Sequence, residues 1–341
     1  MKTIITTFAF TLALATASAQ SPKAENDPNI DPQIRGFLKA LNNSGGKPVE
    51  ALSPADARQV LVGAQKSVEV DYSGIEETEK TITQDGQSIK LHIVKPKGAK
   101  NDIPVFMYFH GGGWVLGDYP THRRLVRDLV VGSGVAAVFP DYTPSPEAQY
   151  PVAVNQGYAA TKWVAEHGAA IGVNGKNLAV VGNSVGGNMA AVVALMAKDK
   201  KGPEIRLQVL LWPVTDADFT RPSYQAYGEG RFLTTNLMKW MWDNYTTDLN
   251  KRKEKYATPF NATLDELKGL PPALVQTAEN DILRDEGEAY ARKMAEAGVA
   301  VTLTRHQGMI HDYGLLNPIA NVPAVQVALL QAAAVIKNTL K

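Results

Sequence analysis

The chain has no cysteine among its 341 residues. Disulfide bonds, thiolate metal sites and catalysis by a thiol are therefore excluded. The fold must be stabilised by its core alone. A hydrophobic fraction of 45% is ample for one large domain, or for a domain with a lid.

The chain also lacks an excess of charge, because 35 basic residues stand against 34 acidic ones and the net charge is +1. Proteins that bind nucleic acid or anionic membrane surfaces usually show a strong basic balance, which is missing here. The predicted partner is a small molecule and not a nucleic acid. Nothing in the sequence indicates the oligomeric state.

The apolar run at the start of the chain is too short to be a membrane anchor. Lys2 precedes this run, which covers residues 4–17 and ends in the small residues Ala17-Ser18-Ala19. This order predicts a secretory signal peptide, residues 1–19, with cleavage after Ala19. A transmembrane anchor is the alternative, but a span needs roughly 20 apolar residues. We therefore expect a secreted or periplasmic protein with no stable membrane insertion.

Short runs of apolar or alternating residues predict eight strands. Helical patterns separate the later strands, and strands alternating with helices favour a mostly parallel sheet covered on both faces, so the predicted fold class is α/β. The first two strands are expected to form an antiparallel hairpin at one edge. The strands are predicted at residues 76–83, 88–94, 103–109, 135–139, 178–181, 207–212, 273–277 and 299–304, and the helices at 123–131, 152–166, 188–197, 286–297 and 322–336.

Two segments do not follow this alternation. Two short helical patterns precede the first strand, and the second of them begins at Ser53-Pro54 with Asp56 three residues after the cap serine. We expect both helices to lie over the sheet. Residues 219–260 follow the sixth strand and are rich in aromatic side chains. These side chains either pack in the core or form a lid that closes on a substrate.

The segment around Ser184 predicts a catalytic nucleophile. An apolar strand over residues 178–181 is followed by Gly182-Asn183-Ser184-Val185-Gly186, and Gly187 opens a long helical run. This strand, turn and helix form the setting in which a serine is held exposed on a tight elbow. Crowding around the serine requires small residues two positions before and after it.

A second motif, His110-Gly111-Gly112-Gly113-Trp114, directly follows the strand at 103–109. Successive glycines leave backbone N–H groups uncovered, so the loop can direct two amides at one oxygen. We predict an oxyanion hole made by the amides of Gly111, Gly112 and Val185. The alternative is a phosphate loop, but it would need a lysine and a Ser or Thr at the helix start. His110 is expected to brace the loop and not to act as the base.

The base and its orienting acid should follow Ser184 in the chain. His311 lies in a glycine-flanked loop beyond the last strand and is favoured over His306, which ends that strand. Asp281 lies in the loop after the seventh strand and is favoured as the acid. The alternatives are Asp285, which could instead cap the next helix, and Asp216 after the sixth strand.

Four sequence blocks resemble the signature blocks of the hormone-sensitive-lipase-like branch of the α/β-hydrolases, in that family's order. The resemblance covers the chain from about Pro32 to its end and implies an eight-stranded α/β-hydrolase fold without a cofactor. It also implies a cap, built from the helices within residues 20–75 and the insertion at about 219–260, on a catalytic domain of residues 76–341. The blocks are His110-Gly-Gly-Gly, Gly182-x-Ser184-x-Gly186-Gly187, Asp281-x-Leu283-Arg284-Asp285-Glu286-Gly287 and Gly308-Met-Ile-His311.

The resemblance implies that Ser184, Asp281 and His311 form the catalytic triad of a carboxylic-ester hydrolase. The chain departs from the family pattern at Asn183 and Val185, where Asp and Ala are usual, and at Asp312-Tyr313, where Gly-Phe is usual. These departures leave the predicted triad intact. We predict a secreted carboxylesterase for short to medium acyl chains. An amidase or a sugar-ester deacetylase would use the same residues, and a non-catalytic ligand-binding protein on this scaffold is the alternative of another class.

Overall fold

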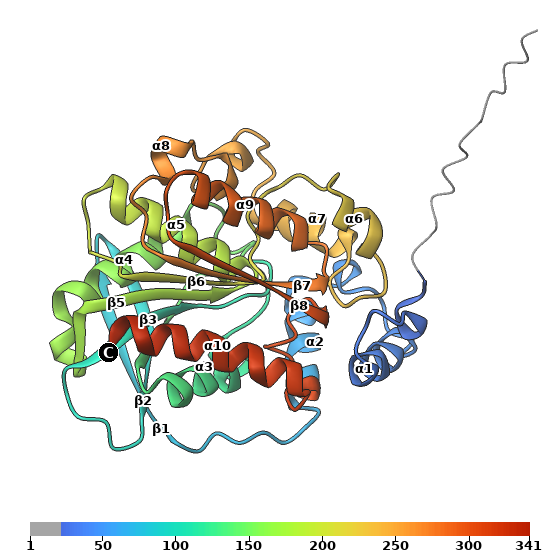
Figure 1. Cartoon of the computed structure of the whole chain (residues 1–341), viewed down its shortest axis with the longest axis horizontal. Helices are drawn as coiled ribbons and strands as arrows, with labels where there is room; N and C mark the ends of the chain where they lie inside the picture. The colour runs from blue at the N-terminus through green and yellow to red at the C-terminus, as the bar shows by residue number, and fades with distance from the viewer. Residues whose placement is uncertain (1–21) are drawn as a thin grey trace, which may run out of the picture.

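The computed structural model describes residues 22–341. The predicted signal peptide, residues 1–19, lies outside the described residues. The described chain forms one eight-stranded sheet in the order β1-β2-β4-β3-β5-β6-β7-β8 (Figure 1). The strands are β1 Ile75–Gln84, β2 Gln87–Pro96, β3 Ile103–Phe109, β4 Ala136–Asp141, β5 Val173–Asn183, β6 Leu207–Leu211, β7 Ala273–Asn280 and β8 Val301–Ile310.

Strand pairing confirms the predicted α/β fold. Strands β1 and β2 form an antiparallel hairpin at one edge, and β2 is also antiparallel to β4. The pairs from β4 through β8 are all parallel. Parallel strands bring their carboxyl ends to one edge of the sheet, which is where ligands bind in open α/β folds.

Helices cover both faces of this sheet (Figure 1). The α-helices are α1 Pro32–Asn42, α2 Pro54–Lys66, α3 Tyr119–Ser133, α4 Val152–His167, α5 Val185–Asp199, α6 Pro222–Tyr227, α7 Thr235–Tyr245, α8 Leu264–Leu267, α9 Arg284–Glu296 and α10 Pro323–Leu340. Short 3-10 helices cover Ala24–Asn26, Val49–Ala51, Gly168–Ile171, Lys251–Lys253, Pro259–Asn261 and Asn317–Ile319.

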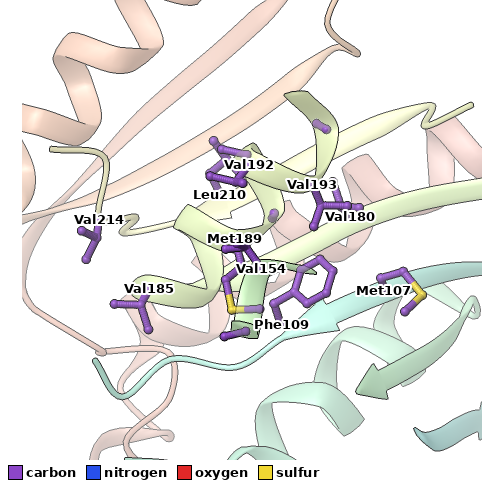
Figure 2. Packing of buried hydrophobic residues seen from close by; sticks show 14 of the residues in the cluster. Met107, Phe109, Val154, Val180, Val185, Met189, Val192, Val193, Leu210 and Val214 are labelled. Carbon is purple, nitrogen blue, oxygen red and sulfur yellow. The ribbon is translucent and has the colours of Figure 1, made fainter. Parts of the chain in front are cut away.

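Side chains alternate between two hydrophobic clusters, one on each face. In β3, Met107 and Phe109 belong to the cluster under α4, α5 and α9, whereas Phe106 and Tyr108 belong to the cluster with α3 and α10. Figure 2 shows the first cluster, where Met189 of α5 lies close to Phe109. Burial of both faces explains why these central strands are continuous apolar runs.

Helices α3 and α5 begin earlier than the apolar spacing predicts, whereas α4 begins at the predicted residue 152. Helix α3 begins at Tyr119 and not at 123, because Asp118 and Thr121 form a capping box there. Helix α5 begins at Val185, immediately after the serine of the elbow, and not at 188. Capping and chain reversal set these ends, and neither leaves a periodic apolar signal.

The segment between β6 and β7 holds α6, α7 and α8. Its helix α7 packs on the loop after β3, where Trp114 stacks on Tyr245 with ring centroids 3.8 Å apart and meets Trp242 at 4.9 Å. All three rings are buried. The aromatic residues therefore do pack in a core, and that core joins the segment to the glycine loop.

Among residues 22–341, every helix is too short or too polar to span a membrane.

Candidate active site

Ser184 lies on a sharp elbow between β5 and α5, with φ of 55° and ψ of −124°. A positive φ is strained for a residue with a side chain, and such strain is common at functional sites. A Cβ on Gly182 would lie 2.1 Å from the Gly186 carbonyl oxygen, and one on Gly186 would lie 2.0 Å from the Phe109 carbonyl oxygen. Both neighbours are backbone, so only glycine fits on either side of the elbow.

The structure brings Ser184, Asp281 and His311 together from three separate loops. His311 Nε2 lies 3.0 Å from Ser184 Oγ, and His311 Nδ1 lies 2.7 Å from Asp281 Oδ2. Ser184 is 4% exposed, and Asp281 and His311 are each 2% exposed. The imidazole can thus accept the serine proton at one nitrogen while the carboxylate fixes its tautomer at the other.

The other oxygen of Asp281 is also held, because its Oδ1 accepts the Leu283 N–H at 2.9 Å. This bond fixes the carboxylate in the loop between β7 and α9. Both oxygens of the acid therefore have donors, one from the backbone and one from His311.

The alternative acids and the alternative base serve elsewhere. Asp285 accepts the Ser223 N–H at 2.9 Å, and the interpretation that it caps the helix is wrong, since Leu283 is the N-cap of α9. Asp216 pairs with Arg221. His306 lies on β8, where burial lowers its pKa. Within residues 22–341, none of the three hydrogen-bonds to the serine or to His311.

The charge environment of His311 favours its protonated form. Burial disfavours a charged imidazole, but the negative charges of Asp281 and Asp312 outweigh it and raise the pKa of His311. Asp312 Oδ2 lies 3.8 Å from His311 Nε2, on the side of the ring that faces the serine. Two carboxylates therefore stabilise the protonated form of His311.

Asp312 and its partners are site residues that the sequence reasoning missed. Asp312 Oδ1 accepts the Trp212 Nε1–H at 2.6 Å and the Asn183 Nδ2–H at 2.9 Å. Asn183 Oδ1 in turn accepts the Tyr108 hydroxyl at 2.9 Å. The sequence did contain a signal for them, because Asn183 and Asp312 both replace the residues that are usual at these positions of the family pattern.

The loop after β3 differs from prediction at one amide. The Gly111 N–H donates to Asn183 Oδ1 at 3.0 Å, so it is already hydrogen-bonded and braces the loop against the elbow. The Gly112 and Gly113 N–H groups find no acceptor within residues 22–341, and both residues have positive φ, 100° and 66°. Val185 is the first residue of α5, where an amide has no partner within the helix. The free amides here are those of Gly112, Gly113 and Val185.

His110 braces this loop, as predicted. Its Nδ1–H donates to the Gly111 carbonyl oxygen at 2.8 Å, and its ring stacks on Tyr142 with centroids 4.1 Å apart. Burial lowers the pKa of His110 to about 4, so the ring is neutral near pH 7. No group of three or more histidine, aspartate or glutamate side chains within residues 22–341 could hold a metal ion.

Comparisons with known proteins agree with this geometry. Residues 106–315 match the family model described as the α/β hydrolase fold. The carboxylesterase NlhH of Mycobacterium tuberculosis is 33% identical, over 92% of this chain and 97% of the relative. An ethyl acetate hydrolase of Pseudomonas putida is 32% identical, over 85% of this chain and 94% of the relative.

A solved structure gives the same result. The crystal structure of a thermostable esterase from Pseudomonas putida ECU1011 has a TM-score of 0.92 at 64% identity, over 92% of this chain and 99% of that chain. These findings confirm the family and the enzyme class predicted from the motifs. The chain therefore belongs to the hormone-sensitive-lipase-like branch of the α/β-hydrolase family and is a carboxylesterase-type hydrolase.

Proposed function

We propose that the protein hydrolyses carboxylic esters of short to medium acyl chains through a Ser-His-Asp triad and a covalent acyl-enzyme. Ser184 is the nucleophile, His311 the general base and Asp281 the residue that orients the base. The observation that carries this proposal is the position of the His311 ring, 3.0 Å from Ser184 Oγ and 2.7 Å from Asp281 Oδ2. Both distances are within hydrogen-bond reach, so the serine proton can pass to His311 while Asp281 orients the ring.

The reaction proceeds in two halves. His311 Nε2 takes the hydroxyl proton while Ser184 Oγ forms a bond to the ester carbonyl carbon. The imidazolium then gives this proton to the alkoxy oxygen, the carbon–oxygen bond breaks and the alcohol leaves. In the second half, His311 Nε2 takes a proton from water while the water oxygen forms a bond to the acyl carbon. The imidazolium then returns this proton to Ser184 Oγ, the bond between Oγ and the acyl carbon breaks, and the carboxylic acid is released.

The tetrahedral intermediate places negative charge on the former carbonyl oxygen. We assign its stabilisation to the amides of Gly112, Gly113 and Val185, with Gly113 in place of Gly111. The Gly111 amide is already donated to Asn183 Oδ1, whereas the other three have no acceptor within residues 22–341. Each donor of this kind contributes roughly 10²–10³ in rate.

Two observations support a small acyl group. Ser184 is 4% exposed, and a Cβ on Gly113 would lie 2.2 Å from Met241 Cγ, so α7 rests directly on the glycine loop. The name of the relative ethyl acetate hydrolase also points to a two-carbon acyl group for that protein. Amide or sugar-acetate substrates would use the same triad and are tested alongside.

A series of p-nitrophenyl esters of increasing acyl length, assayed with residues 20–341, tests the proposal. We expect kcat/KM to be highest at two to six acyl carbons. The change Ser184→Ala should lower kcat by roughly 10⁴-fold or more. Undiminished hydrolysis in that variant would remove Ser184 from the mechanism. Anilide and acetylated-sugar substrates, compared at equal concentration, decide between esterase, amidase and deacetylase.

A fluorophosphonate probe separates an enzyme from a ligand-binding protein. Its reaction requires an activated hydroxyl, so labelling of Ser184 is expected in the native chain and should be lost in Ser184→Ala. An unlabelled native protein that still binds a small ester would favour the binding function.

We also propose that the protein is exported and that cleavage follows Ala19. The basis is the sequence pattern alone, namely Lys2, the apolar residues 4–17 and the small residues before the cleavage site. Expression of the full chain in a bacterial host, followed by N-terminal sequencing of the extracytoplasmic protein, should find Gln20 as the first residue. Retention of the whole chain in the cytoplasm would refute export.

A further inference from the structure

The first described residues pass between the segment that carries α6 and α7 and the loops that carry the triad. We call residues 22–31 the N-terminal clasp. Its Asp27 Oδ2 accepts Arg231 Nη2–H at 2.7 Å, and both side chains are only 4% exposed. The same Nη2 also donates to the Pro22 carbonyl oxygen at 3.1 Å. One guanidinium thus holds both ends of the first turn of the clasp.

A chain of contacts leads from this ion pair to the loop of the catalytic acid. The Tyr227 ring lies near two guanidinium groups, that of Arg231 at 5.3 Å and that of Arg284 at 5.0 Å. Arg284 Nη1 donates to the Tyr227 hydroxyl at 2.8 Å and to the Glu279 carbonyl oxygen at 3.1 Å. Glu279 lies on β7, two residues before Asp281, so the contacts end at the backbone of the end of β7.

The clasp also contacts the end of β7 directly. Asn280, the residue before Asp281, donates its Nδ2–H to the Asn29 carbonyl oxygen at 3.1 Å. Asn29 is held in turn, because its N–H donates to Asp27 Oδ1 at 2.9 Å. Asp27 therefore binds the Arg231 guanidinium with one oxygen. With the other oxygen it holds Asn29, whose carbonyl oxygen accepts the hydrogen bond from Asn280.

The end of β8, which leads to the catalytic histidine, is held by the same segment. The Asp31 N–H donates to the Gly308 carbonyl oxygen at 3.1 Å, and Ile30 forms a parallel bridge with Gly308. The Gly308 N–H donates to Glu279 Oε2 at 2.8 Å. The clasp, the end of β7 and the end of β8 are thus joined by hydrogen bonds. The bonded residue of β8, Gly308, lies three residues before His311.

We propose that Asp27 and Arg231 are positioning residues, whose buried ion pair fixes the N-terminal clasp so that Asp281 and His311 keep their hydrogen-bonded register. This inference rests on the triad assigned under the proposed function. A buried ion pair often adds little to stability compared with apolar residues, because both charges must be desolvated. Both oxygens of Asp27 and Nη2 of Arg231 are hydrogen-bonded, although Arg231 Nε has no hydrogen-bond partner within residues 22–341. We infer that these directed bonds serve to specify one geometry of the clasp.

The test uses Asp27→Asn in the chain of residues 20–341, with Arg231→Lys as a second variant. Arg231→Lys keeps the charge but loses the planar guanidinium, whose Nη2 donates to both Asp27 and Pro22 and which lies near the Tyr227 ring. We expect kcat for p-nitrophenyl acetate to fall by roughly 10–100-fold with a smaller change in KM, the size of loss typical of a misplaced catalytic group. The acid limb of kcat/KM should move to lower pH, because His311 loses part of its contact with the Asp281 charge.

The pH profile distinguishes positioning from a loss of stability. Glu288→Gln is the matched control, since Glu288 is a buried carboxylate paired with Arg305 at 2.6 Å, between α9 and β8. We expect it to lower the melting temperature without moving the acid limb. If Asp27→Asn does not fold, the double change Asp27→Asn/Arg231→Gln replaces the pair without leaving a lone buried charge. It should show the same shift.

The inference is overturned if the clasp variants keep native kcat and an unmoved acid limb, or behave as Glu288→Gln does. Titration of the His311 imidazole by NMR gives the same answer without any assay of turnover. Ser184→Ala separates the two claims. If Ser184→Ala keeps native turnover, the proposed function is refuted. If Ser184→Ala is inactive but the clasp variants keep native kcat and an unmoved acid limb, only the positioning role is refuted.

Discussion

Gly113→Ala is expected to impair the enzyme, because the glycine loop and helix α7 touch at this residue. Gly113 has φ of 66°, and a Cβ there would lie 2.2 Å from both Met241 Cγ and Sδ. An alanine in the left-handed region costs about 1–2 kcal/mol. Overpacking against a well-packed neighbour costs about 1–3 kcal/mol more. The total of about 2–5 kcal/mol corresponds to roughly 30- to 5,000-fold in an equilibrium or rate constant.

The free-energy cost of Gly113→Ala should appear partly as lower activity and partly as lower stability. A double-mutant cycle with Met241 separates the overlap cost from the backbone cost. Kcat/KM for p-nitrophenyl acetate and the melting temperature are measured for Gly113→Ala, Met241→Ala and the combined variant. Met241→Ala removes Cγ and Sδ, the two nearest atoms, but keeps the Met241 Cβ at 2.8 Å. The combined variant should therefore recover most of the overlap cost of about 1–3 kcal/mol and retain the backbone cost. Met241→Ala alone is expected to destabilise the chain by about 2–5 kcal/mol.

Gly36→Ala is the matched control, since no heavy atom lies within 4 Å of a Cβ there and the residue is inside α1. It should leave kcat/KM unchanged and be neutral or slightly stabilising. A Gly113→Ala variant that behaves like this control would refute the contact between α7 and the loop. A cycle with no coupling between positions 113 and 241 would refute the steric part of the argument.

Three further outcomes follow from the site. Asp312→Asn removes a negative charge 3.8 Å from His311 Nε2, so the pKa of His311 should fall and the acid limb of kcat/KM should move to lower pH; an unmoved limb would show that this carboxylate does not act on the base. Asp281→Asn should lower kcat by about 10⁴-fold, because an amide no longer selects the tautomer that frees Nε2; near-native turnover in rapid kinetics would contradict the assigned acid. Gly186→Ala places a Cβ 2.0 Å from the Phe109 carbonyl oxygen, so we expect no soluble folded protein by circular dichroism. A folded variant with native activity would contradict the elbow geometry.

Much of the fold and the meeting of Ser184, Asp281 and His311 could be predicted because their signals are local. Ser184 stands between two glycines at the junction of a strand and a helix, and the structure shows why, since either Cβ would meet backbone. His311 and Asp281 follow the last two strands, and parallel strands necessarily bring such loops to one edge. The alternation of strands and helices indicated a mostly parallel sheet, but it did not predict the order of the strands.

The remaining features depend on contacts between residues far apart in the chain. The Gly111 amide is taken by Asn183, and a loop sequence alone does not show which of its amides have acceptors. Asp312 acts on the site because Trp212 and Asn183 orient it, although the sequence shows only an unusual residue after a histidine. The arrangement of α7 on Trp114 likewise follows from packing between segments that no periodicity links.

The two imidazoles of this region differ in their response to acid. His110 is buried without a carboxylate contact and its pKa is lowered to about 4, whereas two carboxylates raise the pKa of His311. As the medium is acidified, the base therefore gains its proton while the stacked ring beneath the glycine loop is still neutral. Acid should therefore switch off catalysis by protonation of His311 while His110 is still neutral, and neutralisation should restore turnover.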